Sequence, residues 1–110
     1  MESRLEQLQN FLKESPQDPF LKYALTMEFV KLGDKPKARE GFEELVHNHA
    51  DYVGTYYHFG KFLEGEGEKD FANEIYEKGM QVAQQKRNFH ALNELKNAML
   101  MANGLLDDDD

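Results

Sequence analysis

The chain has 110 residues and an apolar fraction of 40%, so it is long enough for one small domain with a single core and too apolar for a disordered segment. It contains no cysteine, which excludes disulfides, thiolate catalysis and cysteine-ligated zinc. The formal net charge of −8 argues against nucleic acid or an anionic membrane as the main partner, because phosphate groups are neutralised by clustered cations.

Helix-start signals divide the first part of the chain. Ser3 and Glu6 have the spacing of a capping box and are followed by an apolar stripe, so we expect a helix over residues 3–14. Asp18 before Pro19 predicts the N-cap of a second helix, because proline is favoured in the first turn.

The remaining chain continues as helices separated by short turns. Gly33 ends the second helix and Asp34 begins the third. The further helices are expected over residues 36–49, 51–65, 70–85 and 88–103. No segment combines two-residue alternation with the β-branched enrichment of strands, so the predicted fold class is all-α.

The sequence repeats itself at an interval of 34 residues, a period typical of stacked helical hairpins. Identical residues at this interval include Tyr23 with Tyr57, Gly33 with Gly67, Lys35 with Lys69, Ala38 with Ala72, Glu40 with Glu74, and Glu43 with Glu77. The chain therefore reads as an array of similar units.

With this pattern the sequence resembles the tetratricopeptide repeat family. Residues 53–86 supply the family's spacing of large, small and aromatic residues through Tyr56, Phe59, Gly60, Leu63, Ala72, Tyr76 and Gly79. The resemblance implies an α-α superhelix of about two helix-turn-helix repeats in one domain, residues 1–110. Its parts would be an N-terminal half-repeat helix (3–14), two repeats (19–52 and 53–86), a C-terminal capping helix (88–103) and an acidic tail (104–110).

The first repeat departs from the family pattern. Its matching residues are Leu25, Phe29, Ala38, Phe42 and Leu45. Lys22, however, stands at the usual position of a large residue, Thr26 replaces the small glycine, and Ala50 replaces the terminal proline. We therefore expect looser packing in the first hairpin than in the second.

The last helix also departs from the family pattern. Extending the 34-residue frame puts polar residues, His90, Asn93, Glu94 and Asn97, at core positions. Shifting the 34-residue frame by about two residues puts Leu92, Leu95 and Met99 at the core positions. We therefore expect an altered turn at QQKRN.

Gly60 lies inside a predicted helix, where glycine costs about 1 kcal/mol relative to alanine. We interpret Gly60 and Ala72 as the small residues that let the two helices of one hairpin approach closely. Phe59, Leu63 and Tyr76 would fill the space beside this contact.

The sequence offers no convergent catalytic set. His47 and His49 are two residues apart and point to different faces of a helix, so they form a poor chelate. His58, Lys61 and Glu64 share a face, but no substrate pocket or oxyanion hole is indicated around them. We therefore expect no enzyme activity, no cofactor and no metal site.

The family resemblance implies a concave groove that binds extended or helical peptides. Its lining would be Phe20, Tyr23, Ala24, Met27, Val30 and Lys31 in the first repeat and Tyr57, His58, Lys61 and Glu64 in the second. Alternatively, the two tyrosines and Met27 pack between neighbouring helices. The first reading predicts an interaction module, an adaptor or scaffold with a protein or peptide partner.

The lysine and asparagine set with which some family members clamp acidic carboxyl-terminal tails is absent. A partner with apolar or aromatic side chains and an acidic group near Lys61 fits these residues better. No run of residues approaches the length of a membrane span, and the charged start differs from a secretory signal. We therefore expect a cytoplasmic protein.

A second reading is a structural subunit that self-associates through its last helix. Four apolar residues near the end of the chain favour a homodimer: Met99, Met101, Leu105 and Leu106. These residues could instead fold back onto the preceding helix.

Overall fold

The computed structural model describes residues 1–105, and none of these residues lies in a β-strand. The elements are α1 (Arg4–Glu14), α2 (Pro19–Leu32), α3 (Lys35–Asn48), α4 (Gly54–Gly65), α5 (Lys69–Gln85) and α6 (Phe89–Ala102). The predicted all-α fold class is confirmed. The chain forms two compact units, unit 1 (Met1–Tyr52) and unit 2 (Val53–Asp110).

Local side-chain caps start most of the helices. Ser3 Oγ accepts the Glu6 N–H at 3.1 Å, and the Glu6 carboxylate returns to Ser3, which completes the predicted capping box. Asp18 Oδ1 accepts the Phe20 N–H at 2.9 Å at the start of α2. Such caps each stabilise a helix by about 1 kcal/mol, which explains why the sequence signals were sufficient to place these starts.

Helix α4 begins later than residue 51, where the sequence predicted its start. Tyr52 N–H donates to the His49 carbonyl at 3.0 Å, so the chain is still turning there. At the start of α4 the Val53 carbonyl accepts from Tyr56 N–H at 3.3 Å. Val53 contributes no side-chain cap.

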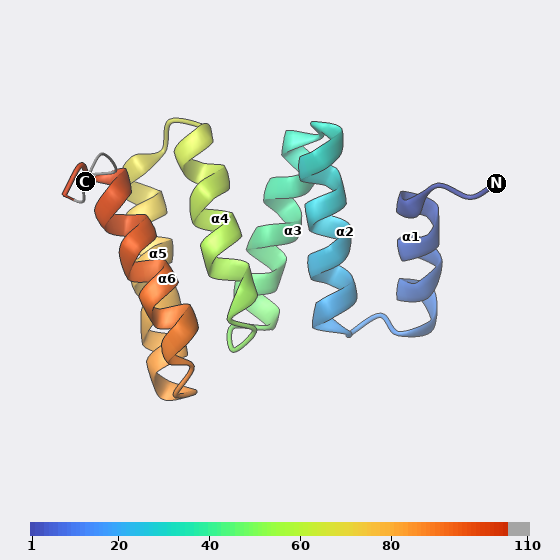
Figure 1. Ribbon diagram of the computed structural model, residues 1–110. Helices are drawn as coiled ribbons and strands as arrows, with labels where there is room; N and C mark the ends of the chain where they lie inside the picture. The colour runs from blue at the N-terminus through green and yellow to red at the C-terminus, as the bar shows by residue number, and fades with distance from the viewer. Residues whose placement is uncertain (106–110) are drawn as a thin grey trace. The chain divides into compact units, whose positions relative to one another are not determined.

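In unit 1, α2 and α3 pack side by side as an antiparallel hairpin, and α1 packs against α2 (Figure 1). The turn between α2 and α3 contains Gly33 at φ 78°, a left-handed conformation that favours glycine. Ala38, Phe42 and Leu45 of α3 are fully buried. Unit 1 is therefore a hairpin with one additional helix on its α2 side.

In unit 2, α4 and α5 form the corresponding hairpin, and α6 packs mainly against α5 (Figure 1). Two glycine contacts join α4 to α5: a Cβ at Gly60 would lie 2.2 Å from Tyr76 Cε1, and a Cβ at Gly79 would lie 2.4 Å from Tyr56 Cβ. Both tyrosines are fully buried. The predicted need for a small residue at Gly60 is confirmed, and the group that requires it is the Tyr76 ring.

Candidate functional site

A cavity of about 420 Å³ lies between α4 and α6 of unit 2. It contains two of the residues predicted for the groove, Tyr57 and His58. Its lining consists of Val53, Gly54, Tyr57, His58, Asn88, His90, Ala91, Glu94 and Leu95. Its volume is within the range of about 300 to 1,000 Å³ that is usual for ligand pockets.

Polar residues of α6 form one wall of this cavity. His90 Nε2 and Glu94 Oε2 are 3.6 Å apart. Burial lowers the pKa of His58 below its ordinary value, and the negative charge of Glu94 partly opposes that shift. Two imidazoles and one carboxylate therefore line the cavity together with Tyr57.

The sequence prediction missed Asn88, His90 and Glu94 as members of the site. A signal was present, because the 34-residue frame placed His90 and Glu94 where core residues normally lie. In the structure Leu95 and Ala98 provide the buried face of α6, while His90 and Glu94 line the cavity.

The outer face of α4 carries a connected set of side chains. Lys61 Nζ lies 5.8 Å from the centroid of the Tyr57 ring and 3.9 Å from Glu64 Oε2. The buried Tyr76 donates its hydroxyl hydrogen bond to the Glu64 carboxylate. Burial, and then this hydrogen bond and the charge of Glu64, raise the pKa of Tyr76. The hydroxyl therefore remains neutral and fixes one carboxylate oxygen at the surface of α4.

The predicted residues on α2 differ in their exposure. Phe20 is 58% exposed and Val30 37%, Lys31 is exposed, and Met27 is half-buried. Tyr23 is half-buried and its ring packs against Tyr52 of the same unit, with 5.7 Å between the centroids. Tyr23 thus has a packing role within unit 1.

The apolar residues proposed for self-association also differ in their exposure. Met101 is 42% exposed and Leu105 73% exposed, whereas Met99 is half-buried. Leu106 and the aspartates at 107–110 lie outside the described residues.

Within residues 1–105 no cluster of three or more histidine, aspartate or glutamate side chains has the arrangement of a metal site. None of the helices in that range combines the length and the apolar character that crossing a membrane requires.

Comparison with known proteins identifies the family through solved structures. No protein-family model and no curated protein matches the chain. A solution structure of a protein from Bordetella parapertussis, 19% identical, superposes with a TM-score of 0.79 over 94% of this chain and 90% of that chain, which supports the fold alone.

Two structures of a tetratricopeptide repeat domain protein from Salinibacter ruber are more similar in sequence. The crystal structure is 44% identical, with a TM-score of 0.76, and the match covers 81% of this chain and 100% of that chain. The solution structure is 42% identical, with a TM-score of 0.78, over 86% of this chain and 96% of that chain. The chain therefore belongs to the tetratricopeptide repeat family, a family of helical protein-interaction modules.

Proposed function

We propose that this protein is an adaptor that binds peptide segments of a protein partner through two surfaces, the exposed face of α2 in unit 1 and the exposed face of α4 in unit 2. The observation that carries the proposal is the cavity beside Tyr57 and His58, next to Lys61 on the same helix. An aromatic ring beside a cavity provides a rigid anchor with little conformational entropy to lose on binding. The exposed Phe20 and Val30 provide apolar surface on α2.

The charges on α4 indicate the chemistry of the peptide. Lys61 is 41% exposed in its side chain, and the carboxylate that lies 3.9 Å from its Nζ, that of Glu64, already accepts a hydrogen bond from Tyr76. A ligand carboxylate can therefore form an ion pair with Lys61 while Glu64 keeps its hydrogen bond from Tyr76. The proposed ligand has an apolar or aromatic side chain followed closely by an acidic group.

The test is affinity capture from the native cell extract with wild type, Tyr57→Ala, Lys61→Glu and the Tyr23→Ala/Tyr57→Ala double variant. Lys78→Glu is the matched control, because Lys78 is exposed on α5, away from the cavity lining. We expect the control to retain the partner and the α4 variants to lose it, with circular dichroism showing that all remain folded. Capture that survives both Tyr57→Ala and Lys61→Glu contradicts the proposal.

Self-association is the second candidate function, and the exposure of Met101 and Leu105 favours it. Light scattering of wild type and Met101→Lys separates the two candidates. A dimer held by this surface dissociates in the variant, whereas a monomeric peptide binder keeps its mass.

A further inference from the structure

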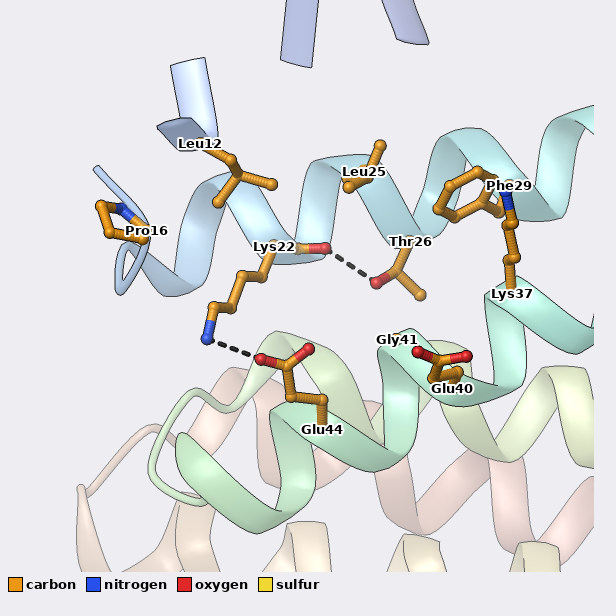
Figure 2. Close-up of a pocket in the computed structure, with 10 residues that line it drawn as sticks. All are labelled: Leu12, Pro16, Lys22, Leu25, Thr26, Phe29, Lys37, Glu40, Gly41 and Glu44. Atoms are coloured by element: carbon orange, nitrogen blue, oxygen red, sulfur yellow. Dashed lines mark hydrogen bonds and ion pairs between the residues drawn. The ribbon is translucent and has the colours of Figure 1, made fainter. Parts of the chain in front are cut away.

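Unit 1 contains a second cavity, of about 380 Å³, bounded by α1, α2 and α3 (Figure 2). Its lining consists of Leu12, Pro16, Lys22, Leu25, Thr26, Phe29, Lys37, Glu40, Gly41 and Glu44. Its residues on α2 follow a different stripe of the helix from Tyr23, Met27 and Val30, so this cavity is separate from the proposed peptide-binding face.

The cavity lies in the hairpin for which looser packing was expected, and its lining differs from the equivalent positions of unit 2. At the same repeat positions as Lys22 and Gly41, unit 2 has Tyr56 and Ile75, which are 0% and 4% exposed. Unit 2 therefore buries an aromatic and a branched aliphatic side chain at two positions where unit 1 has a lysine and a glycine.

Side-chain contacts position the residues that line the cavity. Lys22 Nζ is directed to Glu44 Oε1, at 2.8 Å, and both groups line the cavity (Figure 2). Thr26 is 2% exposed, and its Oγ1 donates to the Lys22 carbonyl at 2.7 Å. A Cβ at Gly41 would lie 2.2 Å from that Oγ1, so residue 41 accepts no side chain while Thr26 is present.

The charges around the cavity balance. Two lysines and two glutamates line it, and Lys22 is paired with Glu44. Lys37 Nζ lies 5.5 Å from the centroid of Phe29, which contributes an apolar wall together with Leu12 and Leu25. With no net charge and an apolar wall, the cavity favours an uncharged group over an ion.

We propose that this cavity receives one bulky uncharged side chain, aromatic or long aliphatic, from a partner protein. The side chain enters the open volume bordered by Lys22, Phe29 and Gly41. Glu40, Glu44 and Lys37 are exposed at the edge, where they can contact the polar backbone that carries the side chain. The protein then has a second docking point that does not depend on the α4 surface.

The experiment uses the ¹⁵N-labelled full chain and three acetylated and amidated pentapeptides with tyrosine, glutamate or lysine between pairs of alanines. We expect the tyrosine peptide to shift the amide signals of Thr26 and Gly41 in a saturable way, and the charged peptides to bind at least about tenfold more weakly. Shifts at Tyr57 report the α4 surface separately, so a failure of one site is distinguishable from a failure of the other.

Two variants fill the cavity with the residues of unit 2, Lys22→Tyr and the double variant Thr26→Gly/Gly41→Ile. Both should lose the shifts in unit 1 while any shifts at Tyr57 persist, and Lys78→Tyr on α5 should behave as wild type. The proposal is overturned if the tyrosine peptide produces no saturable shift in unit 1, if a charged peptide binds equally well, or if the folded filling variants keep the wild-type affinity.

Discussion

The Tyr76 ring occupies the space that a side chain on Gly60 would need, since a Cβ there would lie 2.2 Å from Tyr76 Cε1. The Tyr76 hydroxyl donates a hydrogen bond to the carboxylate of Glu64, which lies one turn after Gly60 on α4. A glycine inside α4 thus determines both the packing of the hairpin and the position of a surface carboxylate. The burial of a full aromatic ring offsets the cost of glycine in the helix.

Gly60→Ala should destabilise the protein by about 1 to 3 kcal/mol, because the new methyl group overpacks the contact with Tyr76. The measurement is urea or thermal unfolding followed by circular dichroism. Gly65→Ala on the same helix is the matched control, since nothing lies within 4 Å of a Cβ there. Equal melting temperatures for wild type and Gly60→Ala would exclude the contact as a constraint.

Thr26 and Gly41 should behave as a coupled pair. Gly41→Ala alone should cost about 1 to 3 kcal/mol, because its Cβ meets Thr26 Oγ1. In a Thr26→Gly background the same change should cost much less, and a double-mutant cycle from urea unfolding measures this coupling. Additive effects of the two changes would show that the pair does not share the space.

Tyr76→Phe should cost about 0.5 to 1.5 kcal/mol at neutral pH, because it removes one hydrogen bond and keeps the ring. The raised pKa of Tyr76 means that folding favours the neutral phenol. This contribution is complete below the ordinary tyrosine pKa of 10.0 and is lost as the pH rises above it. Unfolding in urea between pH 8 and 11, values chosen to bracket the tyrosine pKa of about 10, should show wild type losing stability faster than the variant. If the stability of wild type and Tyr76→Phe changes equally with pH, the proposed dependence of stability on the Tyr76 pKa is contradicted.

His58 should titrate below the ordinary histidine value of 6.5, because burial disfavours its charged form. Since the unfolded chain then binds the proton more tightly, the contribution of His58 to stability decreases as the pH falls below 6.5. Glu94→Gln should lower the pKa of His58 further by removing the opposing charge. Proton NMR titration of the imidazole signals measures both values, and an unchanged His58 pKa in Glu94→Gln would show that the carboxylate does not act on it.

Several features were predictable from sequence because short segments determine them. The capping box of Ser3 and Glu6, and the N-cap of Asp18, are hydrogen bonds between residues at most three positions apart. The glycine that ends α2 has a left-handed backbone that few other residues adopt, so its identity alone marked the turn. The 34-residue repeat of the helical pattern then indicated the family.

The candidate sites could not be predicted to the same depth. Tyr57 and His58 were expected on a binding surface, and both line a cavity, but its α6 wall with His90 and Glu94 was not foreseen. The 34-residue frame marked these two polar residues as unusual without indicating that they border open space.

The sequence by itself determined the helical class, most helix ends and the repeat, because capping, apolar periodicity and turn chemistry act within a few residues of the chain. The tertiary structure alone decided that Thr26 keeps Gly41 bare, that Tyr76 reaches Glu64, and that cavities remain beside α1 and α6. Such contacts join side chains from different helices. Whether a gap stays open depends on the sizes and directions of every side chain around it, which no single stretch of sequence contains.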